Sequence, residues 1–139
     1  MPVLTRYLEY DTKGNSEIID ITDDVIRSVS GSGINNGIVT VFAAGSTVAV
    51  TTLEYESGLI HDLQQALERI APKDIEYKHN ERWHDGNGHS HVRASLLGQS
   101  ESFPLIDGSM LLGTWQQVIF IDLDNRARSR KLVVQIVGE

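Results

Sequence analysis

Two neighbouring stretches, GIVTVFA at residues 37–43 and TVAVTTL at residues 47–53, decide the fold. Both are apolar and rich in β-branched residues, a composition that predicts buried strands. Similar patterns elsewhere predict further strands, at residues 3–10, 16–21, 100–106, 109–112, 117–122 and 131–137. Because the strands come in adjacent runs, antiparallel pairing is favoured over a doubly wound parallel sheet.

Two principal helices are predicted beside these strands. The first begins at Thr22, a residue that favours helix N-caps. The second is capped by Ser57 and ends before Pro72, with its apolar residues on one face. Residues 72–90 are polar and glycine-rich, and we expect them to be irregular. The pattern therefore predicts an α+β fold, mainly antiparallel β-sheet or sandwich, in one domain of residues 1–139.

Composition excludes several classes of protein. The chain has 139 residues and no cysteine, which excludes disulfides, thiolate zinc sites and thiol nucleophiles. Its net charge of −7 disfavours binding to the phosphate backbone of nucleic acids. No apolar stretch approaches the roughly 18–20 residues that span a bilayer, and residues 1–7 lack the pattern of a signal peptide. We expect a cytoplasmic protein without nucleic-acid or membrane partners.

Four of the five histidines lie close together, at His79, His84, His89 and His91. On an extended segment, the two-residue spacing of His89 and His91 would place both imidazoles on one face. Paired imidazoles can bind a divalent metal or exchange protons near neutral pH. His79 or a carboxylate could supply a third ligand. The alternative is that these histidines lie on a solvated polar loop and have no chemical role.

Acidic residues gather where the second helix is expected to begin, at Glu54, Glu56 and Asp62. Close carboxylates can hold a metal, or one of them can have a raised pKa suited to proton transfer. The alternative is that carboxylates favour helix N-termini because of the helix dipole, and this explanation is favoured for Asp62.

Two further polar groups are candidates for ligand binding. Alternation would place Arg126, Arg128 and Arg130 on one face, and arginines suit phosphate or carboxylate groups. Arg130 borders the last strand and is the better candidate, whereas the other two are expected in a solvated turn. Trp115 could stack on a flat ligand and Gln116 could hydrogen-bond to it, although a core or interface role is favoured for Trp115.

Several segments together resemble the YjbQ-type family. The most specific is LIDGSMLLGTWQ at residues 105–116, and the others, in chain order, are Glu54 with the acidic residues after it, His79-Asn80, HVRASLLG at residues 91–98, and the closing run from residue 129. The resemblance covers nearly the whole chain. One position departs from it, because Gly45 stands where many members carry a histidine. His89 is a candidate to replace that histidine.

The resemblance implies a small α+β protein that forms a homotrimer, with weak thiamine-phosphate synthase activity in some members. It further implies a cleft between subunits. Catalytic residues there would be Glu54, Asp62 and His91, and a divalent metal such as zinc or magnesium would be bound by His79, His89 and His91. Ligand-binding residues would be His79, Asn80, Arg93, Ser95, Trp115, Gln116 and Arg130.

Three functional hypotheses follow. The first is an enzyme acting on a phosphorylated small molecule, in which His91 and an acidic partner transfer protons and Arg130 binds phosphate. The second is a non-catalytic trimer that binds a metal or small ligand through the same residues. The third is a structural interaction protein whose polar loop closes an interface.

Overall fold

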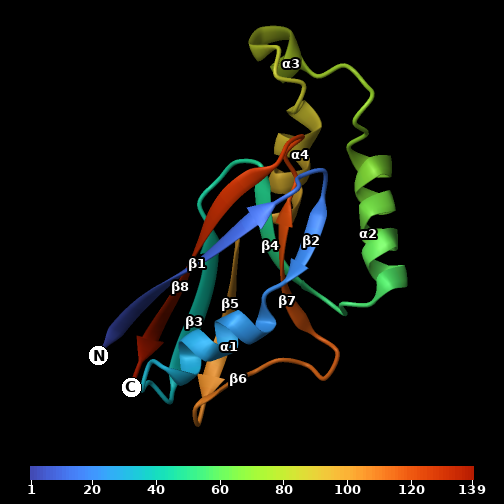
Figure 1. The fold of residues 1–139 in the computed structure, drawn as a ribbon. Coiled ribbons are helices and arrows are strands. Elements are labelled where there is room, and N and C mark those ends of the chain that lie inside the picture. Colours follow the sequence, from blue (N-terminus) through green and yellow to red (C-terminus); the bar gives the residue numbers. More distant parts are fainter.

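A computed structural model describes residues 1–139 and contains two antiparallel sheets and four helices (Figure 1). Sheet A has the strand order β1-β8-β3-β5-β6 and sheet B the order β2-β7-β4. The elements are β1 (Val3–Thr12), β2 (Glu17–Asp20), α1 (Thr22–Ser30), β3 (Gly37–Ala43), β4 (Val48–Leu53), α2 (Ser57–Ile70), α3 (Lys78–Trp83), α4 (Gly88–Leu97), β5 (Ser100–Ile106), β6 (Ser109–Met110), β7 (Gln117–Asp122) and β8 (Arg128–Gly138). The predicted α+β class with mainly antiparallel strands is confirmed.

Strand β7 lies at the centre of the packing. Val118 and Phe120 belong to a core of 16 buried residues, which joins the inner faces of sheets A and B and includes α1. Ile119 and Ile121 point to the other face of sheet B and pack with Leu67 of α2 and with α4. Both faces of β7 are therefore covered, which explains its continuous apolar sequence.

The two predicted helices exist, but their N-terminal caps differ from the prediction. The Thr22 hydroxyl caps nothing; it accepts a hydrogen bond from the Val118 N–H at 2.9 Å and so ties α1 to β7. Helix α2 begins at Ser57 as predicted, but Glu56 caps it by accepting hydrogen bonds from the N–H groups of Gly58 and Leu59. The Glu56 carboxylate thus has a structural role.

Residues 72–90 were expected to be irregular, and this expectation is wrong. They contain all of α3 and the start of α4. Gly88 makes this packing possible, because a Cβ atom there would lie 2.5 Å from the Cβ of Tyr77. The Gly88 N–H donates to the Asn80 side chain at 2.9 Å, which joins the two helices.

Helix α4 buries His89 almost completely. The residue is 2% exposed, its ring lies 6.4 Å from that of Tyr77, and its Nδ1 has no hydrogen-bond partner. Burial lowers the pKa of His89, and the positive charges of Arg93 and Lys73 lower it further. The folded protein therefore resists protonation of His89.

None of the four helices combines the length and apolar character needed to cross a bilayer.

Replacing Glu56 with alanine should lower the free energy of unfolding by about 1 kcal/mol, because two N–H groups at the start of α2 lose their acceptor. Urea denaturation measures this change. Glu54→Ala is the matched control, since Glu54 is an exposed carboxylate two residues away whose side chain makes no hydrogen bond. Equal losses in the two variants would rule out the capping role.

The pKa of His89 predicts a loss of stability in mild acid. Below about pH 6.5 the unfolded chain takes up a proton at this residue that the folded protein resists, so the free energy of unfolding decreases as the pH falls. His91, whose pKa is also lowered, acts in the same direction. In His89→Leu we expect a shallower decrease between about pH 6.5 and pH 5 than in the wild type, measured by urea denaturation at several pH values.

His61→Leu, a change at an exposed histidine of α2, should keep the wild-type decrease. If His89→Leu and the wild type lose stability in parallel, His89 is not a source of the acid sensitivity.

Candidate functional site

The helical conformation of α4 separates the two histidines of the H-x-H motif. Residues two apart point to nearly opposite sides of a helix, so the prediction that His89 and His91 share a face is wrong. His89 packs inward against Tyr77, whereas His91 meets His79 of α3, with ring centroids 4.4 Å apart and an interplanar angle of 50°. His79 and His91 therefore form a pair without His89.

The His79 ring is held on one side by two oxygen atoms. Its Nε2 lies 3.1 Å from Oδ1 of Asn87 and 3.3 Å from Oδ1 of Asp85. Burial and the neighbouring His79 lower the pKa of His91. The pair thus consists of one imidazole beside a carboxylate and one that resists protonation, an arrangement suited to acid–base chemistry.

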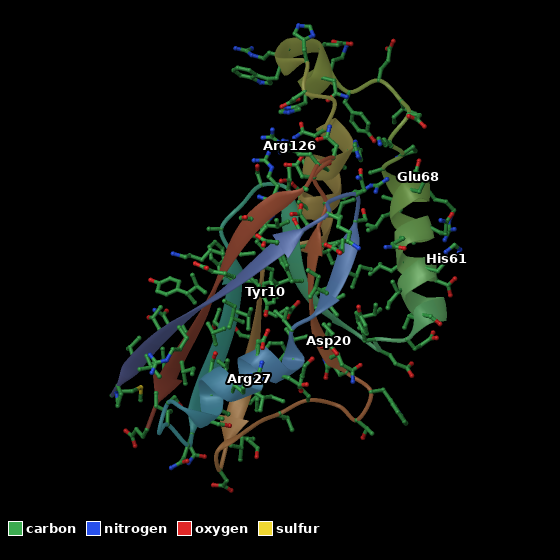
Figure 2. All side chains as sticks on the ribbon, viewed as in Figure 1. Tyr10, Asp20, Arg27, His61, Glu68 and Arg126 are labelled. Carbon is green, nitrogen blue, oxygen red and sulfur yellow. The ribbon has the colours of Figure 1, made fainter.

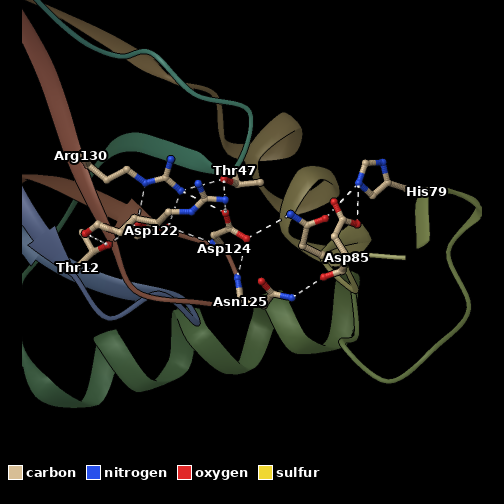
Figure 3. Close-up of polar contacts among 10 residues, drawn as sticks. Thr12, Thr47, His79, Asp85, Asp122, Asp124, Asn125 and Arg130 are labelled. Atoms are coloured by element: carbon tan, nitrogen blue, oxygen red, sulfur yellow. Dashed lines mark hydrogen bonds and ion pairs between the residues drawn. The ribbon is translucent and has the colours of Figure 1, made fainter. Parts of the chain in front are cut away.

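Asn87 links the histidine pair to a buried polar network (Figure 3). Its side-chain N–H₂ donates to Oδ1 of Asp124 at 3.2 Å, and Arg128 donates to Oδ2 of the same carboxylate at 2.7 Å. Burial alone would raise the pKa of Asp124, but the hydrogen bonds from the Asn125 N–H and Asn87, with the charge of Arg128, lower it below its usual value. Asp124 is therefore ionised, and both of its carboxylate oxygens accept hydrogen bonds.

Arg130 belongs to the deepest part of this network. Its Nε and Nη2 donate to Asp122 at 2.8 and 3.1 Å, and Nη2 also donates to Thr47 at 2.9 Å. Asp122 is fully buried and accepts a further hydrogen bond from Thr12. These contacts give Arg130 a structural role, and its predicted contact with phosphate stays a prediction. A Cβ at Gly45 would lie 3.6 Å from Nη1 of Arg130, so the position that departs from the family pattern borders this network.

A polar cavity of about 190 Å³ opens beside His79, lined by Asp85, Asn87, Asp124, Asn125, Arg126 and Arg128. The charge of Asp124 is balanced by Arg128, while Arg126 is exposed and forms no ion pair. Figure 2 shows Arg126 at the end of the molecule where α4 begins. The cavity therefore has one arginine that forms no ion pair, and it lies next to an imidazole pair.

Three other residues that were predicted to bind a ligand belong to α3 and α4, and each makes different contacts. Arg93 is buried and donates to the Ala71 carbonyl, to the Ser16 hydroxyl and to Glu68, so it fastens α4 to α2 and to the start of β2. Asn80 uses its oxygen to hold Gly88. Ser95 is exposed on α4, one turn beyond His91 on the same face.

The remaining predicted residues lie elsewhere in the chain. Glu54 follows the end of β4, and Trp115 and Gln116 precede β7, whereas the histidine pair lies at the other end of these strands. Glu54 lies six positions along the extended chain from Val48, which pairs with Asp122, a span of about 20 Å. Figure 1 likewise shows that α2 begins at its end farther from α3.

The side chains at this far end differ in exposure. Trp115 is 71% exposed, which excludes a core role. The Gln116 side chain accepts a hydrogen bond from the Gly113 N–H and donates one to the Thr52 hydroxyl, so it stabilises the turn that contains it. Asp62 is exposed on α2. One chain alone does not bring Glu54 or Trp115 to His91.

The three histidines predicted as metal ligands do not fit a metal together. His89 faces Tyr77 rather than the His79–His91 pair, and no group of three His, Cys, Asp or Glu side chains in the chain is arranged to hold an ion. A zinc or magnesium ion on His79, His89 and His91 of one chain is therefore not supported by their geometry.

Sequence reasoning missed Asp85, Asn87, Asp122 and Asp124 as residues of this site. The pattern Asp122-Leu-Asp124 directly after a buried strand was a usable signal, because acidic residues at the end of an apolar strand need partners. The pairing of Asn87 with Asp124 had no such signal.

Comparison with known proteins identifies relatives over the full length. A family described as "UPF0047 protein YjbQ-like" matches residues 6–139. A UPF0047 protein of Methanothermobacter thermautotrophicus is 44% identical over 139 residues, covering 100% of this chain and 95% of the relative.

Solved structures agree with this relationship. A YbjQ-like protein of unknown function from Sulfolobus solfataricus superposes with a TM-score of 0.90 at 34% identity, covering 99% of this chain and 100% of the other. An uncharacterised conserved protein of the YjbQ/UPF0047 family from Clostridium acetobutylicum has a TM-score of 0.87 at 34% identity, covering 95% and 99% of the two chains. With its strands, helices and polar site arranged on this shared fold, the chain belongs to the YjbQ-like UPF0047 family.

Proposed function

We propose that the protein binds a phosphorylated small molecule in the cavity beside His79 and performs acid–base chemistry on it with His79 and His91. The observation that carries this proposal is the position of the imidazole pair beside a cavity that contains Arg126, an arginine without an ion-pair partner. The two ring centroids are 4.4 Å apart. The His79 ring contacts Asp85 and Asn87, two of the residues that line that cavity.

One arginine of the cavity is free to pair with an anion. Arg126 has no carboxylate partner, and Arg128 uses Nη2 on Asp124 while its Nε is buried without a partner. A phosphate oxygen can accept hydrogen bonds from both guanidinium groups. The carboxylates of Asp85 and Asp124 are already engaged by His79 and Arg128. The lining thus carries two guanidinium groups and two carboxylates, and Arg126 is the cation that a phosphate group could pair with.

The two histidines suit different roles. Burial and the neighbouring His79 lower the pKa of His91, so it is the candidate base. His79 contacts the Asp85 carboxylate, so a proton on His79 would form an ion pair and be available to a leaving group. Opposite environments for two close titratable groups are typical of acid–base sites.

Thiamine-phosphate synthase activity is one specific case of this proposal, and it rests on the family resemblance alone. That reaction would join a pyrimidine pyrophosphate to a thiazole phosphate and release pyrophosphate. No relative in the comparisons carries a name that states a reaction. Binding without turnover is the second candidate function, since the same arginines and histidines could hold an anion.

The test of the anion site is the binding of inorganic pyrophosphate to the full-length chain, measured by isothermal titration calorimetry. Arg126→Met should weaken binding about tenfold to a hundredfold, because a charge-assisted hydrogen bond contributes about 1.5–3 kcal/mol. Arg69→Met removes an exposed arginine of α2 that forms no ion pair, and it should bind as the wild type does. Equal affinities of the wild type and Arg126→Met would overturn the anion site.

Turnover separates the two candidate functions. Release of pyrophosphate from the pyrimidine and thiazole phosphates is assayed with the wild type and with His91→Ala. Loss of turnover in His91→Ala with unchanged pyrophosphate binding supports the acid–base role. Binding by the wild type without turnover of these substrates excludes the synthase and leaves binding alone.

We also propose that the protein acts as a homotrimer in which Glu54 of one chain approaches His91 of the next. The support is that these residues lie at opposite ends of one chain, together with Trp115, and a ring of head-to-tail contacts joins unlike ends. Co-expression of Glu54→Ala and His91→Ala chains should restore part of the turnover that each variant lacks. No recovery in mixed trimers, or a monomer in sedimentation equilibrium, would contradict the shared site.

A further inference from the structure

We infer that Asn87 is a positioning residue that fixes His79 in a single tautomer, with the proton on Nε2, so that Nδ1 is the atom of His79 that exchanges protons with a ligand. The tautomer follows from hydrogen-bond chemistry in this structure alone. Only its use in proton exchange rests on the proposed function.

The first step is the orientation of the Asn87 amide. An amide has a donating N–H₂ end and an accepting oxygen end, whereas an ionised carboxylate only accepts. Asn87 lies 3.2 Å from Oδ1 of Asp124, which also accepts from the Asn125 N–H and stays ionised through Arg128. The N–H₂ end must therefore face Asp124, and the amide oxygen must face the other way.

The second step identifies the nitrogen of His79 that contacts the Asn87 amide oxygen. Oδ1 of Asn87 lies 3.1 Å from Nε2 of His79, and Oδ1 of Asp85 lies 3.3 Å from the same nitrogen. Neither oxygen can donate when Asp85 is ionised, so Nε2 must carry a proton to bond to either one. A neutral His79 protonated on Nδ1 would place a lone pair against two acceptors.

The third step is the state of the other nitrogen. Nδ1 of His79 forms no hydrogen bond with the protein, and the side chain is 32% exposed. In the neutral ring this nitrogen holds the lone pair, within reach of solvent or a ligand. Because Asn87 is 7% exposed and anchored on a buried carboxylate, it supports the ring more rigidly than Asp85, whose side chain is 47% exposed.

The test is nitrogen-15 NMR of the histidine side chains in the full-length protein, at about pH 8 where imidazoles are neutral. The wild type should show His79 with a protonated Nε2 and an unprotonated Nδ1. Asn87→Ala should move both shifts toward the average of two tautomers, because an unconstrained ring samples both. A wild-type His79 that is already averaged, or protonated on Nδ1, would overturn the inference without any variant.

Two variants assign the effect to Asn87. Asp85→Ala, a change at an exposed side chain, should keep the single tautomer; averaging in this variant with retention in Asn87→Ala would make Asp85 the positioning residue instead. Asn80→Ala breaks the link between α3 and α4 without touching His79, so it should leave the tautomer unchanged if loosening alone is not the cause.

The catalytic consequence is measured separately. Asn87→Ala should lower kcat about tenfold, a larger effect than any change in pyrophosphate affinity, because Asn87 lines the cavity but Arg126 and Arg128 are intact. The NMR result needs neither ligand nor turnover. If His79 has a single tautomer but the protein has no activity, the proposed acid–base function is wrong and this inference stands. If the protein is active but His79 populates both tautomers, this inference is wrong and the proposed function stands.

Discussion

The buried ion pair between Asp122 and Arg130 is the contact on which the rest of the site depends. A buried carboxylate is costly unless a well-placed cation and further donors compensate for lost hydration. Here the planar guanidinium supplies two donors, and Thr12 supplies a third. Since Asp122 ends β7 and Arg130 lies in β8, the pair joins sheet B to sheet A at one end of the molecule. Asp124 continues this polar network, because its carboxylate binds Asn87, which in turn contacts His79 of the histidine pair.

The fold could be predicted where hydrophobic pattern alone decides it. Residues 118–121 of β7 are all apolar because sheet A covers one face and helices α2 and α4 cover the other, and a continuous apolar run indicates such a strand. Helices α3 and α4 could not be found in this way. Their segment is polar and glycine-rich, and the contact of Gly88 with Tyr77 and Asn80, made only in the folded chain, stabilises them. Tertiary packing there outweighs local propensity.

The site could be predicted only in part, for the same reason. The resemblance singled out His79 and His91, and alternation correctly placed Arg128 and Arg130 on one side, where both approach Asp124. The spacing argument for His89 failed because it assumed an extended segment, and two residues that share a face in a strand diverge in a helix. Asn87 and Asp124 are 37 residues apart, and no local pattern reports a pairing of that range.

The distribution of charge narrows the class of ligand. The chain carries a net charge of −7, so its overall field repels long polyanions such as nucleic acids. Near the cavity the balance differs, because three arginines, Arg126, Arg128 and Arg130, match three carboxylates, Asp85, Asp122 and Asp124, and Arg126 forms no ion pair. A small anion that reaches the cavity could pair with Arg126, and screening over about 8 Å at physiological salt weakens the repulsion from distant carboxylates. This distribution disfavours a polyanion more than a small anion, in keeping with the proposed phosphorylated ligand.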